Sequence, residues 1–190
     1  MQLQKAIVRF DGLFNKDLID RIINYIDTEH LRYLPTLGKT DARKVKGITA
    51  VNPDNFVNVG NQEMSKLIFF NYIKQQLKIP MLNYTVRFRG CAFDDFIQAD
   101  FLKYEVGGKY ETHADDHPKA TRRVTIIINL NEGYEGGDFV FFDPINRRDI
   151  IHKETLKKGS ILIFPSNFLY PHSIQPITKG TRYSLVTWAA

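Results

Sequence analysis

A histidine and an aspartate stand two residues apart, at His113 and Asp115 of the 190-residue chain. Side chains at positions i and i+2 of an extended strand point to the same face, so this imidazole and this carboxylate lie a few ångströms apart. A nitrogen and an oxygen donor placed in this way suit a divalent first-row metal ion. About half of the chains of similar composition would contain such a pair by accident, so a third ligand is needed.

The residues before this pair predict a strand, a sharp turn and a second strand. Phe101, Lys103 and Glu105 alternate with Leu102, Tyr104 and Val106, which places the two sets on opposite faces. Gly107-Gly108 permits the turn, because glycine adopts positive φ at no steric cost. If the strand then resumes, alternation groups Tyr110 with Thr112 and Ala114, and Glu111 with His113 and Asp115.

Four other histidines are candidates for the third ligand. His30 follows the first predicted helix, outside the β-rich region, and His117 is too close to Asp115 to complete a rigid site easily. His152 follows a strand-like segment and remains a candidate. His172 follows a strand that ends at Phe164 and a loop that ends in Pro171. Two histidines and one carboxylate leave about three metal positions open, as in non-haem Fe(II) oxygenases, whereas zinc would keep about one.

An arginine that opens the last predicted strand distinguishes between these two metals. Arg182 stands ten residues after His172 and begins a strand that runs to Trp188. Taken alone, Arg182 would be read as a surface residue. In the interior of an apolar barrel an arginine is costly unless a carboxylate meets it, and its planar fork binds a carboxylate through two hydrogen bonds. The sequence therefore allows an anionic cosubstrate beside the metal.

Length and composition limit the classes of protein to which this chain can belong. The length suits one domain, and the 14 Phe and 9 Tyr favour strands. The single cysteine, Cys91, excludes an internal disulfide and a cysteine-built zinc site. No run reaches the roughly 18–20 apolar residues of a membrane span, and the N-terminus lacks a signal-peptide core. The net charge of +5 permits an acidic or nucleic-acid partner without requiring one, and we expect a soluble, cytoplasmic protein.

Taken in order, the chain reads as helices followed by strands. We expect a strand over 6–10, a helix capped by Asn15 to about Glu29, and a second helix from Asn61 or Gln62 to about Leu77, ended by Pro80. Between them, residues 31–60 read either as a solvated loop or as a basic flap around Lys39–Lys46. The predicted strands are Asn83–Phe88, Phe96–Val106, Val124–Leu130, Asp138–Phe142, Ile161–Phe164 and Tyr183–Trp188.

This order predicts an α+β, mainly β fold, a double-stranded β-helix or jelly roll with the N-terminal helices packed against its major sheet. We expect a single domain over 1–190, with a helical lead-in and flap over 1–80 and the jelly-roll core over 82–190.

From Phe101 to Trp188 the chain resembles the 2-oxoglutarate- and Fe(II)-dependent dioxygenases of the prolyl 4-hydroxylase type. Only the two-helix lead-in matches over the first 80 residues. The motifs that carry the resemblance are Tyr104-x-x-Gly107-Gly108-x-Tyr110-x-x-His113-x-Asp115, Arg122-Arg123-Val124-Thr125 with Leu130-Asn131, Gly136-Gly137-Asp138, Lys158-Gly159-Ser160, Phe164-Pro165, Pro171-His172, and Gly180-Thr181-Arg182 with Trp188.

The resemblance implies a role for each matching position. His113, Asp115 and His172 would bind iron, with Arg182 acting beside them in catalysis. Arg182 would hold the distal carboxylate of 2-oxoglutarate, and Tyr104 would hydrogen-bond to the same end. The cosubstrate site would also include Thr125 and Asn129. Asn129 replaces a tyrosine found in some relatives, and its amide could still donate to a carboxylate. Tyr110, Arg122 and Trp188 would line the pocket for a substrate proline.

The resemblance implies hydroxylation of prolyl residues in a protein or peptide, with Fe(II), 2-oxoglutarate and O2 and with ascorbate as a further expected cofactor. Alternatives are the same iron chemistry on another residue, a free amino acid or nucleic acid, and, more distantly, a non-catalytic jelly-roll binding module. We expect a monomer or homodimer that does not engage a membrane.

Overall fold

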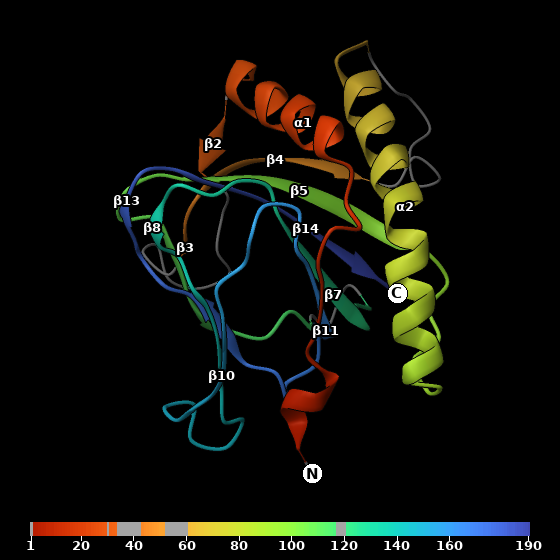
Figure 1. Ribbon diagram of the computed structural model, residues 1–190, viewed down its shortest axis with the longest axis vertical. Coiled ribbons are helices and arrows are strands. Elements are labelled where there is room, and N and C mark those ends of the chain that lie inside the picture. Colours follow the sequence, from red (N-terminus) through yellow and green to blue (C-terminus); the bar gives the residue numbers. More distant parts are fainter. Residues whose placement is uncertain (1, 30, 34–42, 52–60, 117–120) are drawn as a thin grey trace.

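The computed structural model describes residues 2–29, 31–33, 43–51, 61–116 and 121–190. Its core consists of two antiparallel sheets that face each other (Figure 1). The larger sheet has seven strands, in the order β1 (Val8–Phe10), β11 (Ile161–Pro165), β7 (Val124–Asn129), β14 (Arg182–Ala189), β5 (Phe96–Tyr104), β4 (Lys46–Val51) and β2 (Arg32–Tyr33).

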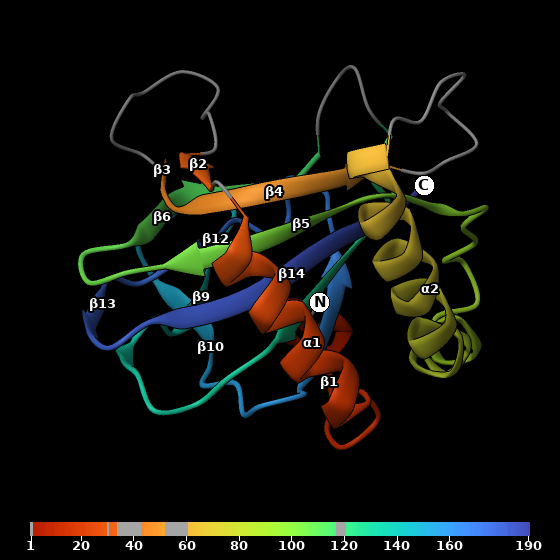
Figure 2. The same ribbon diagram turned by 90° about the horizontal axis from the view of Figure 1, so that it is seen from above.

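The smaller sheet has five strands, in the order β10 (Ile150–Glu154), β9 (Phe139–Phe142), β12 (His172–Ile174), β6 (Lys109–His113) and β3 (Arg43–Lys44). A separate short pair is formed by β13 (Ile177–Lys179) and β8 (Glu135–Gly136). The helices are a 3-10 turn, η1 (Leu3–Ala6), and two α-helices, α1 (Lys16–Thr28) and α2 (Asn61–Arg87). The predicted jelly roll, with helices against the larger sheet, is confirmed (Figure 2).

Helix α1 begins where the sequence predicts. The side-chain oxygen of Asn15 accepts a hydrogen bond of 3.0 Å from the backbone N–H of Leu18, which satisfies one of the free donors of the first turn. Its buried stripe then packs on the outer face of the larger sheet and consists of Leu18, Ile19, Ile22 and Ile26.

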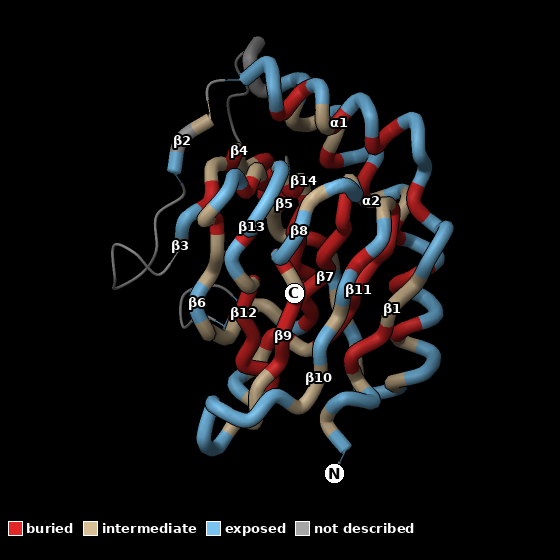
Figure 3. The backbone as a smooth tube through the Cα atoms, turned by 60° about the vertical axis from the view of Figure 1, so that its left-hand side comes forward, coloured by how far each residue is buried: buried red, intermediate tan, exposed pale blue. Residues whose placement is uncertain are grey.

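Strand alternation divides the larger sheet into an outer and an inner face. On β7, Ile126 and Ile128 join the cluster that contains the helices, whereas Ile127 joins the cluster between the two sheets. On β11, Ile163 faces the helices and Leu162 faces the interior. Because each fully buried apolar side chain contributes about 1.5–3 kcal/mol, both clusters stabilise the fold. Figure 3 shows buried segments along the strands and also along helix α1.

The predicted end of the second helix at Pro80 is wrong, and so is the predicted strand Asn83–Phe88. Helix α2 continues through Pro80 to Arg87. A proline inside a helix costs about 3 kcal/mol. Met81 and Tyr84 continue the helical spacing of Leu77 beyond the proline, are buried against the core, and outweigh that cost at about 1.5–3 kcal/mol each. The Tyr84 hydroxyl also donates to the carbonyl of Ala6 at 2.9 Å.

The prediction of a loop or flap over residues 31–60 is also wrong where the structure describes them. Residues 43–44 pair with β6 and residues 46–51 pair along β5, so this segment joins the smaller sheet to the larger one. Lys46 therefore belongs to a strand. Lys39 and most of the predicted flap lie outside the described residues.

The remaining predicted strands are confirmed with shifts of a few residues at their ends, except that β1 begins at Val8 because η1 precedes it.

Candidate active site

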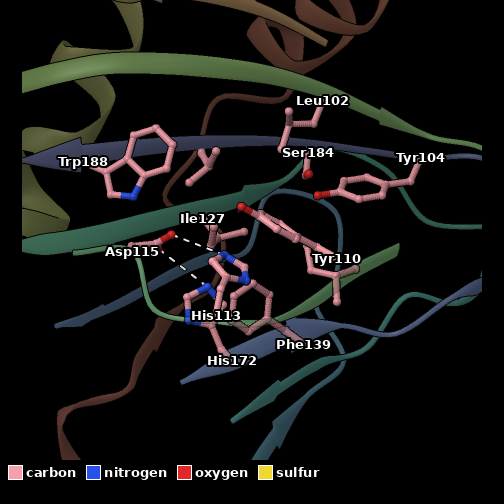
Figure 4. Close-up of a pocket in the computed structure, with 12 residues that line it drawn as sticks. Leu102, Tyr104, Tyr110, His113, Asp115, Ile127, Phe139, His172, Ser184 and Trp188 are labelled. Carbon is pink, nitrogen blue, oxygen red and sulfur yellow. Dashed lines mark ion pairs between the residues drawn. The ribbon is translucent and has the colours of Figure 1, made fainter. Parts of the chain in front are cut away.

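The two sheets bring three potential metal ligands together between them. His113 ends β6, His172 begins β12, and the two residues are cross-strand partners. Asp115 follows β6 and lies 3.4 Å from His113, Nε2 to Oδ1, and 3.6 Å from His172, Nε2 to Oδ2. The ligand atoms of the three residues all lie within 4.8 Å of one another, which suits a single ion (Figure 4).

Backbone carbonyls orient the two imidazoles. Nδ1 of His113 lies 2.8 Å from the carbonyl oxygen of Glu111, and Nδ1 of His172 lies 3.0 Å from that of Tyr170. A carbonyl only accepts, so each Nδ1 carries the proton and each Nε2 keeps its lone pair for a metal.

Electrostatics favours the ligating forms of His172 and Asp115. Burial lowers the pKa of His172 to about 4, so this imidazole is neutral near pH 7. Burial alone would raise the pKa of Asp115, but His172, His113 and Thr125 together hold it below its usual range. A neutral imidazole and an ionised carboxylate are the forms that bind a metal.

A β-bulge in β6 explains how Tyr110 reaches the same site. His172 pairs with His113 and Ile174 with Tyr110, so two steps along β12 match three steps along β6. The predicted grouping, with Tyr110 and His113 on opposite faces, is therefore wrong. The Tyr110 ring stacks on His113 with ring centroids 3.6 Å apart.

Thr125 lies behind Asp115. Its buried hydroxyl donates to Oδ2 of Asp115 at 2.7 Å and lies 2.8 Å from the Ser166 hydroxyl. Because the Thr125 proton goes to Asp115, Ser166 must donate to Thr125. This chain of hydrogen bonds orients the carboxylate. No local pattern in the sequence had indicated Ser166.

Among the described residues, no other histidine joins the three. His152 lies on β10, where its Nε2 is 2.8 Å from Glu154 Oε1. His30 and His117, the remaining candidates, lie outside the described residues.

Strand β14 spans the pocket beside the three ligands. Alternation turns Ser184, Val186 and Trp188 inward, and all three line one pocket together with the metal ligands. Figure 4 shows Trp188 and Tyr104 at opposite ends, with His113, Asp115 and His172 facing the space between them. Ser184 and Val186 were not predicted, although their spacing from Arg182 and Trp188 could have indicated them.

Arg182 lies at the Tyr104 end and is only 1% exposed. Its Nε donates to Oδ1 of Asn129 at 3.2 Å, and its guanidinium carbon lies 5.3 Å from the centre of the Tyr104 ring. Its Nη1 is buried and has no hydrogen-bond partner within the described part of the chain. A buried guanidinium with an unmatched donor fits an anionic ligand such as a carboxylate.

Arg122 and Trp188 form the other end of the site. The guanidinium carbon of Arg122 lies 3.8 Å from the centre of the Trp188 ring, and Nη1 of Arg122 donates to the Asp115 carbonyl at 3.4 Å. The structure therefore places Arg122 and Trp188 beside the ligand loop and Tyr110 on His113, which brings the three predicted substrate residues around the metal ligands.

Comparison with known proteins agrees with this geometry. Residues 99–190 match the family described as the 2OG-Fe(II) oxygenase superfamily. The match includes β6, β7, β12 and β14, the strands that carry the site residues. Members of that superfamily use Fe(II), 2-oxoglutarate and O2, and the two histidines, the carboxylate and the buried arginine fit those groups by their donor chemistry.

Curated relatives carry the name PKHD-type hydroxylase. The protein of Aliarcobacter butzleri is 29% identical over 159 residues, which cover 78% of this chain and 66% of the relative. The protein of Gloeothece citriformis is 34% identical over 94 residues, which cover 46% of this chain and 40% of the relative. The chain thus spans between two fifths and two thirds of the length of these relatives.

Solved structures share the fold. A prolyl hydroxylase from Trichoplax adhaerens, in complex with a peptide fragment of the hypoxia inducible factor oxygen degradation domain, superposes with a TM-score of 0.73 at 15% identity, covering 97% of this chain and 83% of that one. A prolyl-4-hydroxylase from Pseudomonas putida gives 0.62 at 19% identity, covering 97% and 91%. The sequence-based resemblance to the 2-oxoglutarate/Fe(II) dioxygenases of the prolyl 4-hydroxylase type is confirmed.

Within the described ranges, no helix is both long and apolar enough to cross a bilayer.

Proposed function

We propose that this protein is a 2-oxoglutarate- and Fe(II)-dependent dioxygenase that hydroxylates prolyl residues in a protein or peptide and releases succinate and CO2. The observation that carries the proposal is the arrangement along β14, where the metal ligands face a pocket that ends at Trp188 on one side and, on the other, at Tyr104, the cross-strand partner of Arg182.

In this proposal His113, Asp115 and His172 hold Fe(II), which when bound supplies the activation of O2 coupled to the oxidative decarboxylation of 2-oxoglutarate. Arg182 binds the distal carboxylate, and the Tyr104 hydroxyl donates to the same group. Tyr104 lies at one end of the pocket and Arg182 is its cross-strand partner, so the distal end of the cosubstrate would be held there.

Trp188 at the other end and Tyr110 beside His113 offer flat apolar faces to a proline ring. Arg122 stacks on Trp188 and holds its ring in place. The apolar side chains of Leu102, Ile127 and Val186 help to keep water from the reacting carbon. The names of the structural neighbours, prolyl hydroxylases that include one solved with a peptide, support a protein or peptide as the substrate.

The proposal includes ascorbate as the reductant that keeps the iron in the ferrous state, a cytoplasmic location and a monomer or homodimer. It also treats residues 1–190 as one dioxygenase domain, because α1 and α2 pack on the sheet that carries the site. The lone Cys91 suits a reducing compartment.

Incubation of the Fe(II) protein with 2-oxoglutarate, ascorbate and a library of proline-containing peptides tests the function. We expect peptides that gain one oxygen atom on proline, with an equal amount of succinate, and His113→Ala should abolish both products. Succinate coupled to oxidation of another residue, of a free amino acid or of nucleic acid would contradict the prolyl substrate and retain the oxygenase chemistry.

A further inference from the structure

Asn129 on β7 is fully buried, and every hydrogen-bonding group of its amide is engaged. Nδ2 donates to the carbonyls of Asn131 at 2.7 Å and Leu156 at 3.0 Å. Oδ1 accepts from Nε of Arg182 at 3.2 Å and from the hydroxyl of Tyr134 at 3.1 Å. The partners fix which atom is oxygen and which is nitrogen, because carbonyls only accept and the arginine N–H only donates.

This arrangement leaves Asn129 no free N–H for a ligand. The sequence had suggested that its amide could donate to a carboxylate, but both amide protons go to backbone carbonyls. The atom that Asn129 directs at Arg182 is an acceptor. Its contact is therefore with the guanidinium, and it carries no charge that would neutralise the arginine.

The guanidinium is fixed by this contact. An arginine fork is planar, so anchoring Nε sets the direction of the edge formed by the two terminal nitrogens. Nη1 on that edge is buried and has no hydrogen-bond partner among the described residues. Asn129 thus binds the guanidinium at Nε and leaves the terminal nitrogens for a ligand.

Gly137 makes room for this packing. Its φ is +69°, and a Cβ at this position would lie 3.2 Å from Cδ of Arg182, 3.3 Å from Cε2 of Tyr134 and 2.5 Å from Cδ1 of Ile177. A side chain would therefore clash with Ile177 and press against both Arg182 and Tyr134. Gly137 lets the Tyr134 ring and the stem of the arginine lie together beside Asn129.

We propose that Asn129 and Tyr134 form an orienting clamp on Arg182, which presents the terminal nitrogens of the guanidinium to the distal carboxylate of a 2-oxo dicarboxylic acid. The clamp sets the preference for a dicarboxylic over a monocarboxylic 2-oxo acid. Asn129 and Tyr134 are positioning residues that act through Arg182. The inference rests on the proposed function, because it assigns the distal end of the cosubstrate to Arg182.

The test compares two ligands that differ only at the distal end. 2-Oxoglutarate and 2-oxopentanoate have the same 2-oxo acid group, but the second lacks the distal carboxylate. Dissociation constants are measured anaerobically on the Fe(II) protein for wild type, Asn129→Asp and Tyr134→Phe. Ile128→Val on the same strand serves as control, because its side chain faces the helices.

We expect Asn129→Asp to weaken 2-oxoglutarate binding by at least about 30-fold, because the new carboxylate competes for the guanidinium. Tyr134→Phe removes a single hydroxyl and should weaken it about 3- to 10-fold. The affinity for 2-oxopentanoate should stay within about twofold in both variants, and Ile128→Val should leave both affinities unchanged.

Equal weakening of both ligands, or an unchanged preference in both variants, would overturn the clamp. If Asn129→Asp does not fold, Tyr134→Phe decides alone. Failure of wild type to bind 2-oxoglutarate while it binds Fe(II) would instead contradict the proposed function, so the two failures are distinguishable.

Discussion

The two faces of the seven-stranded sheet are built from the same strands but from different kinds of side chain. The outer face of β7 and β14 carries Ile126, Ile128 and Leu185, which pack against the helices. The inner face of the same strands carries the buried polar residues Thr125, Asn129, Arg182 and Ser184. It also carries the apolar Trp188. Because successive side chains point to opposite faces, one face of each strand packs against the helices and the other lines the site.

The two faces are stabilised in different ways. The outer face gains free energy in proportion to the apolar area that it buries. On the inner face each buried polar group costs free energy unless a hydrogen-bond partner satisfies it. Thr125 donates to Asp115 and Arg182 donates to Asn129, but Nη1 of Arg182 has no partner among the described residues. Substitutions on the outer face should therefore change stability, whereas those on the inner face should change ligand binding.

The largest effect is expected for Arg182→Met. Loss of the guanidinium should weaken 2-oxoglutarate binding by at least about 100-fold, since hydrogen bonds to charged groups contribute about 1.5–3 kcal/mol each. The free energy of unfolding should stay the same or rise, because a buried cation with an unmatched donor is replaced by an apolar side chain. Ligand titration and urea unfolding measure the two quantities. A large loss of stability with unchanged binding would reverse the roles assigned to the two faces.

Leu185→Ala, three residues further along β14, should have the opposite profile. Its side chain is fully buried on the outer face, and truncation should cost about 2–5 kcal/mol of the free energy of unfolding. The folded variant should bind 2-oxoglutarate within about twofold of wild type, as measured at a temperature well below its melting midpoint. A large change in affinity would show that the outer packing also controls the site.

Thr125→Val tests whether Thr125 supports the metal or the cosubstrate. Valine has a similar shape but cannot donate to Asp115, so metal affinity should fall about 10- to 100-fold. Isothermal titration with Mn(II) measures this affinity. At saturating metal the affinity for 2-oxoglutarate should be unchanged. A selective loss of 2-oxoglutarate affinity would instead support the cosubstrate role that the family resemblance implied for Thr125.

The smallest effect is expected for Arg122→Lys. Lysine keeps the charge but loses the planar stacking on Trp188, and cation–π contacts contribute about 0.5–2 kcal/mol. The KM for a peptide substrate should rise about 3- to 10-fold, with the KM for 2-oxoglutarate unchanged. An equal change in both KM values would place Arg122 outside the substrate end of the pocket.

The sequence-based predictions were correct where side-chain alternation and motif spacing alone determine the structure. The capped helix α1, most of the central strands and the pairing of His113 with Asp115 needed only local patterns, whereas the family resemblance supplied His172. It failed where distant contacts decided the structure. Burial of Met81 and Tyr84 carried α2 through Pro80, and a bulge opposite β12 turned Tyr110 towards His113.

The sequence also could not show the partners of the site residues. Asn129 meets Tyr134 and Leu156 only because β7, the β7–β8 connection and the segment after β10 converge, and no local pattern records this. Ser166 reaches Thr125 across 41 residues for the same reason.

Anaerobic titration of the Fe(II) protein with 2-oxoglutarate tests the central claim most directly, because chelation of the iron by a 2-oxo acid gives a visible charge-transfer band. We expect a saturable band in wild type, no band in His113→Ala, and a band in Arg182→Met only at much higher 2-oxoglutarate concentration. Wild-type protein that binds Fe(II) but gives no band at any 2-oxoglutarate concentration would contradict it.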